Sequence, residues 1–222
     1  MADLVLLNGQ IWTVDPDRPE ASAVAINQNR ILAVGQDSNV KELIGPETKV
    51  INLKGAFVLP GFIDAHTHFL NGGFALKSVK LRDCRRREEF ISRIAAKASE
   101  LPSGAWIVNG DWDHEQFSPP ELPRKEWIDA VTPNHPVCVN RFDGHMVLVN
   151  SLALKLAKIG RDTVSPSGGE IVKDSLTGEP TGILKDAACD LIYAIIPEPS
   201  LEEKLAAVRI ALQEAASHGV TS

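Results

Sequence analysis

The dipeptide Pro60-Gly61 divides the chain into two stretches with different residue patterns, and this division constrains the fold more than any other feature. Before it, short β-rich runs alternate with turn signals such as Asn8-Gly9, which is typical of hairpins. No helix of normal length fits before residue 36, and residues 38–44 have room for one helical turn. The sequence therefore predicts a small β-sheet or sandwich over residues 1–59.

After Pro60-Gly61, apolar residues recur at helical spacing between short β-rich runs, which predicts an α/β arrangement over residues 60–222. The final helix is the clearest, because Ser200 and Glu203 form a capping box and Gly219 provides a stop signal. Residues 161–182 predict a long loop or a small hairpin. We expect helices at 88–101, 123–130, 151–158, 184–196 and 200–218, and strands at 105–109, 137–141 and 220–222.

Bulk composition excludes several classes of protein. The net charge of −6 argues against nucleic acid as a main partner, because phosphate binding depends on clustered Lys and Arg. The odd set Cys84, Cys138 and Cys189 contains no CxxC pair, which predicts three reduced thiols. No signal peptide and no apolar run of ~20 residues is recognisable, so we expect a cytoplasmic protein without a membrane partner.

The segment from Leu59 to His68 carries the sharpest chemical signal. If it is a strand, Asp64, His66 and His68 project to one face. Two imidazoles at this spacing can reach one cation, and neutral imidazole is a good zinc ligand. Asp64 could accept a hydrogen bond from a ligating histidine and fix its tautomer. The alternative is a pair of surface histidines, but the preceding apolar run favours metal ligands.

Several motifs, in their order along the chain, carry a family resemblance. Asn8-Gly9 and the segment Val58 to His68 resemble the start of an amidohydrolase-superfamily enzyme. Later motifs resemble the YtcJ-like (amidohydrolase-3 type) subgroup: Gly110-Asp111-Trp112-Asp113, Leu122-Pro123-Arg124, His135-Pro136-Val137, Arg141-Phe142-Asp143-Gly144-His145, Val149-Asn150-Ser151-Leu152-Ala153-Leu154, Gly168-Gly169-Glu170, Gly178-Glu179-Pro180-Thr181-Gly182-Ile183-Leu184 and Gly219-Val220-Thr221-Ser222.

This resemblance implies a distorted (β/α)₈ barrel, with a β-sandwich built partly from the N-terminal residues. It implies a divalent metal, usually zinc, at the C-terminal ends of the barrel strands, where such barrels hold their active sites. His66 and His68 would be metal ligands at the end of the first barrel strand. The implied reaction is metal-assisted hydrolysis of a non-peptide C–N bond in a small molecule, such as an amide, a formamide or a cyclic amide.

The resemblance also suggests weaker candidates for substrate binding. His145 and Asp143 lie in a region that resembles a pocket wall in the subgroup, and Trp112 could provide an apolar floor. For His145, a structural role within its loop is the alternative, and both remain open. For Trp112 and its neighbours Asp111 and Asp113, ordinary loop packing is the favoured interpretation.

Other reactive residues receive plainer interpretations. Lys185 could bridge two metals as a carboxylated lysine, as in some superfamily members, but an exposed helix start at Lys185-Asp186 is favoured. His114, His135 and His218 are expected to be structural or exposed. No base adjoins the cysteines in the sequence, so a thiol nucleophile is disfavoured.

The resemblance further implies residues that this chain does not supply. Family members take two more histidines and a late aspartate, the general acid/base, from later strands. A complete barrel takes ~250 residues, and residues 104–182 are expected to form an inserted α+β subdomain. We therefore expect an N-terminal portion, inactive alone, whose open edges permit oligomerisation. The alternative is a non-catalytic binding or regulatory module. The sequence leaves the substrate and the metal identity open.

Overall fold

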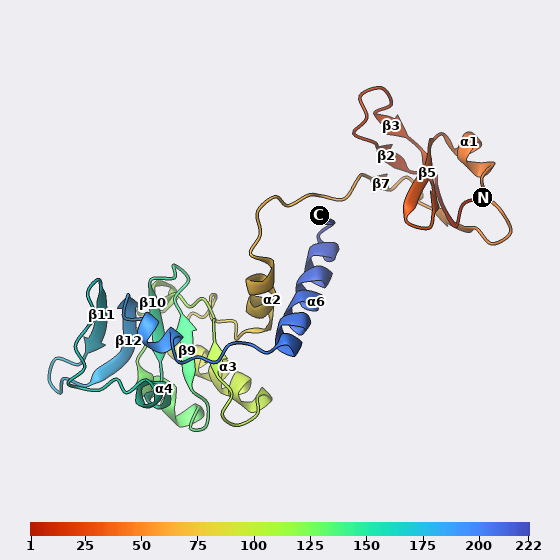
Figure 1. Ribbon diagram of the computed structural model, residues 1–222. Coiled ribbons are helices and arrows are strands. Elements are labelled where there is room, and N and C mark those ends of the chain that lie inside the picture. The colour runs from red at the N-terminus through yellow and green to blue at the C-terminus, as the bar shows by residue number, and fades with distance from the viewer. The chain divides into compact units, whose positions relative to one another are not determined.

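A computed structural model describes residues 1–222, which form two compact units. The first unit comprises residues 1–67 together with 215–222, and the second comprises residues 68–214. Figure 1 shows the strands of the first unit and the helices and strands of the second in chain order. Both helices and mixed sheets are present, so the predicted α/β class is confirmed.

The first unit contains two small sheets. β5, β4, β1 and β6 form one sheet in that order, and β3, β2 and β7 form the other. The elements are β1 (Leu4–Leu7), β2 (Gln10–Trp12), β3 (Glu20–Ala21), β4 (Ala23–Asn27), β5 (Arg30–Gly35), α1 (Asp37–Lys41), β6 (Lys49–Asn52) and β7 (Phe57–Val58).

Alternation along β4 explains how these elements pack. Ala23 and Ala25 point into one apolar cluster, which includes Val40 of α1. Val24 and Ile26 belong to another cluster, which includes Ile11 of β2. The four-stranded sheet therefore packs on α1 with one face and on the three-stranded sheet with the other, as the period-2 pattern predicts.

A short parallel pairing links the two ends of the first unit. Phe62 bridges Val220, and three backbone hydrogen bonds of 2.8–2.9 Å join residues 62–64 to residues 219–222. The expected strand at 220–222 is therefore present as a short parallel segment. The rest of a barrel is not described by these residues, so the barrel remains a proposal.

The second unit is built around the five-stranded sheet β11-β12-β10-β9-β8. Its elements are α2 (Phe69–Lys77), α3 (Arg87–Glu100), β8 (Ile107–Val108), β9 (Val137–Asn140), β10 (Met146–Val149), α4 (Ser151–Leu156), β11 (Gly169–Lys173), β12 (Pro180–Asp186), α5 (Asp190–Tyr193) and α6 (Leu201–Ser217), which continues into the first unit after residue 214.

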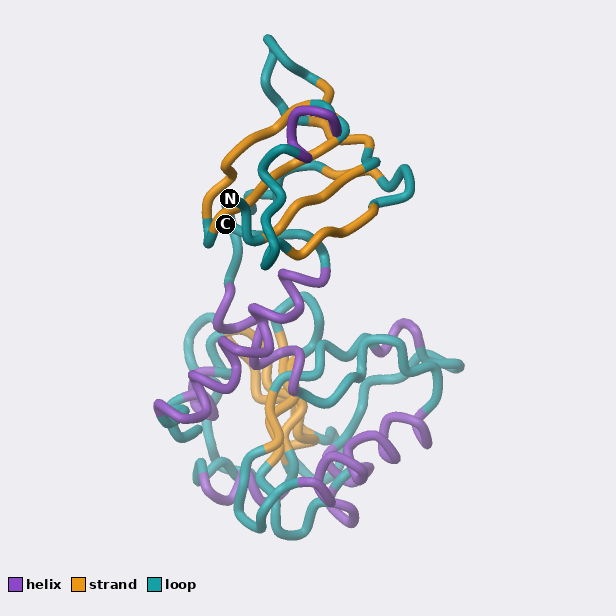
Figure 2. The backbone as a smooth tube through the Cα atoms, turned by 90° about the vertical axis from the view of Figure 1, so that its right-hand side faces the viewer, coloured by secondary structure: helices purple, strands orange, loops and turns teal.

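Both faces of the five-stranded sheet are covered. Val139 and Leu148 contact one apolar cluster with Phe90 of α3. Their neighbours Cys138 and Val149 contact another cluster, which includes α4 and α5 residues. Figure 2 shows the strands of this unit inside, with helices around them. Burial of both faces explains why these strands read as continuous apolar runs rather than as alternating ones.

Two predicted helices differ from the structure. Residues 184–186 complete β12, and α5 covers only Asp190–Tyr193 of the helix expected at 184–196. Leu184 is buried in the sheet, where its β-rich neighbours favour pairing with β10. The helix expected at 123–130 is two 3₁₀ turns, Lys125–Trp127 and Asp129–Val131. The hairpin expected around Thr177-Gly178 is present as β11 and β12.

None of the helices combines the length and the apolar character that a membrane crossing needs.

Candidate functional site

The segment that carries the predicted metal ligands is extended only at its start. Strand pairing reaches Asp64, whose N–H donates to the carbonyl of Ser222. The chain then bends at Ala65-His66, and the Asp64 carboxylate accepts a 3.1 Å hydrogen bond from the backbone N–H of His66. Asp64 therefore supports the backbone of His66, and the expected hydrogen bond between Asp64 and an imidazole ring stays a prediction.

His68 follows at the start of a helix. It is the N-cap residue of α2, and its carbonyl accepts a 2.8 Å hydrogen bond from the N–H of Gly72. His66 and His68 are both exposed. The expectation that a single strand projects both imidazoles to one face was wrong, because the bend and the helix start intervene. Their role as metal ligands stays a prediction.

Polar side chains gather at one edge of the five-stranded sheet. The parallel strands β8 and β9 end at this edge, and the antiparallel pairing places the start of β10 and the end of β12 there too. We call this edge the polar edge. Its residues are Asp111, Asn140, Arg141, Asp143, His145 and Asp186.

His145 and Asp186 contact each other at the polar edge. The Nδ1 atom of His145 lies 2.9 Å from Oδ1 of Asp186. The backbone N–H of Asp186 also donates to the carbonyl of His145 at 2.8 Å. The His145 side chain is 73% exposed, so its other ring nitrogen can meet a ligand. The structure thus brings together one predicted site residue and one whose role the sequence left undecided.

Asp143 fixes the backbone just before this pair. Its carboxylate accepts a 3.0 Å hydrogen bond from the N–H of His145 and pairs with the Arg141 guanidinium. Partial burial raises the pKa of Asp143. The hydrogen bonds to His145 and Arg141 lower it by more than burial raises it, so the net pKa lies below its usual value. Arg141 also pairs with Glu115 at 3.1 Å and lies 3.6 Å from Asp113. Asp143 is therefore an ionised member of a charged network.

The backbone at the polar edge is conformationally unusual. Asn109 and Asp111 have φ values of 64° and 52°, and Gly110 lies between them at 125°. Asp186 has a φ of 48°. Non-glycine residues at positive φ are uncommon, and Asn and Asp tolerate the left-handed region best. A 2.7 Å hydrogen bond from Asn140 Nδ2 to Asp111 Oδ1 holds this turn against β9.

Trp112 lies in the core of the second unit. Its side chain is 0% exposed, and its indole N–H donates to the carbonyl of Val139 at 2.8 Å. Its backbone bonds to Asn140 and Phe142. In this conformation Trp112 cannot touch a ligand directly, and ordinary loop packing, the favoured interpretation, describes its position. It supports the chain that leads to Asp143 and His145.

The remaining reactive residues have structural roles. Lys185 lies on β12 and not at a helix start, and its Nζ contacts Glu170 at 2.8 Å. The three cysteines are free and buried. Burial raises the thiol pKa of Cys84 and Cys189 to about 11 and that of Cys138 to about 12. They are therefore protonated near neutral pH, which disfavours thiol nucleophiles.

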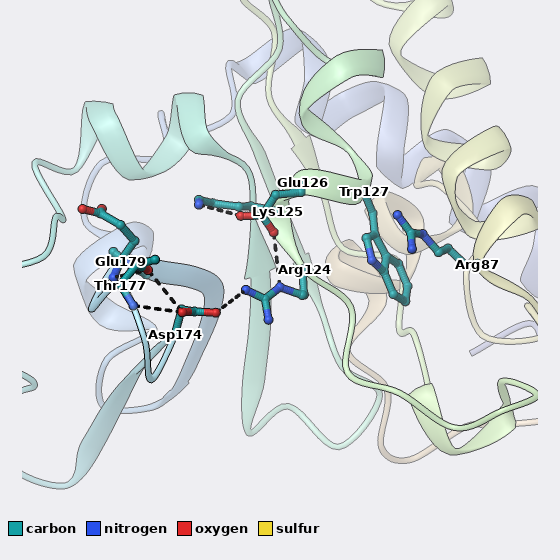
Figure 3. Close-up of a pocket in the computed structure, with 9 residues that line it drawn as sticks. Arg87, Arg124, Lys125, Glu126, Trp127, Asp174, Thr177 and Glu179 are labelled. Atoms are coloured by element: carbon teal, nitrogen blue, oxygen red, sulfur yellow. Dashed lines mark hydrogen bonds and ion pairs between the residues drawn. The ribbon is translucent and has the colours of Figure 1, made fainter.

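A pocket of about 490 Å³ opens at the other end of β12. Figure 3 shows Arg124 directed toward Asp174, and Arg87 beside the Trp127 ring. Arg124 pairs with Asp174 at 3.0 Å, and Arg87 lies 4.8 Å from the ring centroid of Trp127. Strand β12 begins with Pro180, which lines this pocket, and ends with Asp186, which contacts His145. The pocket therefore lies ~20 Å along the strand from His145. None of the predicted site residues lines it.

Sequence reasoning missed three members of the polar edge as site residues, namely Asn140, Arg141 and Asp186. Arg141 stands in a motif with Asp143 and His145, but its pairing with Asp113 and Glu115 depends on the parallel register of the segment after β8 with β9. Asp186 lies 41 residues from His145, and the helix expected at 184–196 concealed it. A strand prediction for 180–186 antiparallel to 146–149 would have revealed the pair.

Comparison with known proteins identifies the family of this chain. Residues 49–222 match the sequence model of the Amidohydrolase family. The chain is 40% identical over 222 residues to the Protein LONG AFTER FAR-RED 3 of Arabidopsis thaliana, covering 100% of this chain and 38% of that protein. It is 34% identical over 214 residues to YtcJ of Bacillus subtilis (strain 168), an amidohydrolase by name, covering 96% and 40%.

A third relative is the N-substituted formamide deformylase of Arthrobacter pascens, which is 34% identical over 199 residues, covering 87% of this chain and 36% of that protein. Among solved structures, a metal-dependent hydrolase from Pyrococcus furiosus, described as uncharacterized, aligns with a TM-score of 0.70 and 26% identity. That alignment covers 99% of this chain and 43% of the other.

The chain belongs to the amidohydrolase family, and its relatives include YtcJ-like amidohydrolases, as the motifs predicted. It spans 36% to 40% of the length of the three curated relatives described above.

Proposed function

We propose that residues 1–222 supply the first metal-binding segment of a metal-dependent hydrolase that cleaves C–N bonds outside peptides. The observation that carries this proposal is the pair His66 and His68, which directly follows an apolar stretch in a chain of the amidohydrolase family. The Pyrococcus furiosus protein of similar fold is described as metal-dependent, which supports a divalent metal. Zinc is the metal that we favour, because both donors are imidazoles.

The donor set fits the first two ligands of such a metal. One residue separates His66 from His68, so their Cα atoms lie within ~7 Å of each other through the chain alone. A catalytic zinc normally has three protein donors. No group of three or more His, Cys, Asp or Glu side chains is arranged to hold a metal in residues 1–222. We propose that the other donors and a general acid/base aspartate lie outside them, so that the chain is inactive alone.

A bound divalent metal would polarise a carbonyl and favour the ionisation of water. We propose that His145 and Asp143 contribute to substrate binding at the polar edge, where His145 is exposed and Asp143 is ionised. Trp112 would contribute indirectly, because its backbone bonds to the segment that precedes Asp143. We propose two domains, a β-sandwich portion (1–59) and a partial barrel (60–222) with an inserted subdomain at about 104–182.

We propose a small amide-type molecule as substrate. The Arthrobacter pascens relative is named for the deformylation of N-substituted formamides, which supports a formamide over other C–N substrates. The net charge of −6 argues against a nucleic acid. Three free cysteines suit a reducing compartment, so we propose the cytoplasm.

A non-catalytic binding or regulatory module is the second candidate. The observation that favours it is the Arabidopsis relative, whose name states no reaction. The presence of both His66 and His68 favours the hydrolase, because a module without catalysis has no need for the pair.

The test is hydrolysis of N-methylformamide, acetamide and a lactam by the natural gene product that contains residues 1–222. We expect turnover that a chelator abolishes, that added Zn²⁺ restores, and that the double variant His66→Ala/His68→Ala lacks. Turnover that persists in the chelator or in the double variant would contradict the metal-dependent mechanism. Metal binding without hydrolysis of any substrate would favour the non-catalytic candidate.

Residues 1–222 alone serve as the matched comparison. We expect no turnover above that of the double variant, because the chain supplies two imidazole donors. Measurable metal-dependent hydrolysis by this chain alone would overturn the proposal that further donors are required.

A further inference from the structure

Asp186 holds His145 through two hydrogen bonds made by different atoms. Its carboxylate lies 2.9 Å from Nδ1 of the His145 ring, and its backbone N–H donates to the His145 carbonyl at 2.8 Å. The φ of 48° at Asp186 turns the chain at the end of β12, and this turn allows the side chain to reach back. A surface ion pair formed by chance would not need this backbone geometry.

The loop before His145 is fixed as well. Asp143 accepts the N–H of His145 at 3.0 Å and pairs with Arg141. The N–H of Gly144 donates to the Arg141 carbonyl at 3.0 Å, and its φ of 76° closes the turn. The Arg141 side chain is only 12% exposed, so the turn is anchored by a largely buried side chain. Both the backbone and the ring of His145 are therefore held in place.

The chemistry of the contact selects one form of the imidazole. An ionised carboxylate can only accept hydrogen bonds, so the Nδ1 atom beside Asp186 must carry the proton. In the neutral ring the proton is then absent from Nε2, which presents a lone pair. Because 73% of the His145 side chain is exposed, this lone pair faces solvent or a ligand.

We infer that Asp186 is a positioning residue that holds His145 as the Nδ1–H tautomer, so that Nε2 accepts a hydrogen bond from an N–H or O–H group of a small ligand. The inference deepens the proposed role of His145 in substrate binding and rests on it. It assigns a role to Asp186, and it gives the ligand one required feature, a hydrogen-bond donor. An amide N–H meets this requirement.

The tautomer of His145 can be measured by ¹⁵N NMR of the imidazole ring at a pH at which the ring is neutral. In the wild-type chain we expect the proton on Nδ1 and an unprotonated nitrogen shift at Nε2. In Asp186→Ala we expect His145 to change to the Nε2–H form that free imidazole side chains prefer. Asp186→Asn keeps a carbonyl acceptor and tolerates the positive φ, so it should retain the wild-type tautomer at least in part.

Lys185→Ala is the matched control. It removes a charge from the adjacent residue of β12, whose Nζ contacts Glu170 and not the His145 ring. This variant should keep the wild-type tautomer. An unchanged tautomer in Asp186→Ala would overturn the positioning role, as would a loss of the Nδ1–H form in Lys185→Ala.

The acceptor role of Nε2 is tested with two probes of nearly equal size. N-Methylformamide carries one N–H donor, and N,N-dimethylformamide carries none. We expect the first probe to shift the Nε2 resonance of His145 in the wild type, and to shift it less in Asp186→Ala, and we expect the second probe to leave it unchanged. No shift with N-methylformamide, or equal shifts with both probes, would contradict the acceptor role. Neither readout depends on metal binding. A failure of the proposed hydrolase function can therefore be distinguished from a failure of the positioning role of Asp186.

Discussion

Asn150 is the residue whose buried hydrogen bonds connect the most segments of the second unit. It is 1% exposed and caps α4 by accepting the N–H of Ala153 at 2.9 Å. The same oxygen accepts the N–H of Val137 at 3.1 Å. Its Nδ2 donates to the Thr132 hydroxyl at 2.9 Å and to the His135 carbonyl at 2.8 Å. One side chain thus satisfies groups on three separate segments.

We predict that Asn150→Ala lowers the free energy of unfolding by about 3 kcal/mol. The variant loses a helix cap, which contributes about 1 kcal/mol, and leaves buried donors and acceptors unpaired at about 1–3 kcal/mol each. Urea denaturation followed by the fluorescence of the buried Trp112 and Trp127 measures this change. Asn39→Ala, at an exposed position of α1, is the control and should change the stability little. A loss below about 1 kcal/mol in Asn150→Ala would refute the role of Asn150.

The ion pair of the pocket in Figure 3 predicts a dependence of stability on pH. The pKa of Asp174 is lowered to about 2 by the backbone N–H of Thr177, the Arg124 guanidinium and the backbone N–H of Leu176. A carboxyl whose pKa is depressed on folding stabilises the protein above its unfolded pKa, and this stabilisation is lost as the pH falls toward the folded pKa. The relevant window therefore runs from about pH 4 to about pH 2.

We expect Asp174→Asn to be less stable than the wild type near pH 7, and the difference to shrink as the pH falls from about 4 to about 2. Denaturant midpoints measured across this range test the prediction. Ser175→Ala, in the same exposed turn, removes no charge and should give a difference that does not vary with pH. A constant difference for Asp174→Asn would contradict the assignment.

At the scale of elements, the contact between α2 and α6 depends on a single glycine. A Cβ atom added at Gly73 would lie 2.2 Å from the carbonyl oxygen of Ala207 and 2.7 Å from its carbonyl carbon. Both atoms belong to the backbone of α6, so the helices would have to move apart. Gly72, one position earlier in α2, has no heavy atom within 4 Å of its added Cβ.

We predict opposite effects for these neighbouring glycines. Gly73→Ala should lower the free energy of unfolding by about 1–3 kcal/mol through overpacking. Gly72→Ala should be neutral or stabilising by up to about 1 kcal/mol, because alanine is the better helix former. Chemical denaturation of the two variants side by side measures both changes. Equal effects would show that the close approach of α2 and α6 does not hold in solution.

Elements with strong local signals were predictable from the sequence. The capping box is present, since Ser200 N–H donates to the Glu203 carboxylate at 2.7 Å and Glu203 N–H to the Ser200 hydroxyl at 3.2 Å. The helix at 87–100 differs by one residue at each end from the prediction. By contrast, a buried strand at 180–186 looks like a helix start, because both faces are apolar and alternation is absent.

The candidate site was predictable only in part, for a similar reason. Neighbours in the sequence, such as Asp143 and His145, share a motif and could be found together. Asp186 joins them only through the pairing of β10 with β12, which no local pattern encodes. The bend at His66 was also missed, because the Asp64 carboxylate competes for backbone donors and ends the strand early.

At the scale of the whole molecule, the central claim is that residues 66–68 begin a metal centre. The chain spans 36% to 40% of the length of the three curated relatives described above, so the activity of the whole protein is a proposal. The metal-binding claim concerns His66 and His68, and it is tested on the natural gene product that contains these 222 residues.

The most direct measurement is elemental analysis of the purified natural gene product that contains residues 1–222, after loading with Zn²⁺ and removal of excess metal, beside its His66→Ala/His68→Ala variant. His218→Ala is the control. His218 comes before its paired segment, which contains Val220, whereas His66 and His68 come after theirs, which contains Phe62. Because the two segments are parallel, His218 lies toward the opposite end of the pairing. We predict that the wild type and the control hold about one equivalent more zinc than the double variant. Equal zinc in all three proteins would contradict the account.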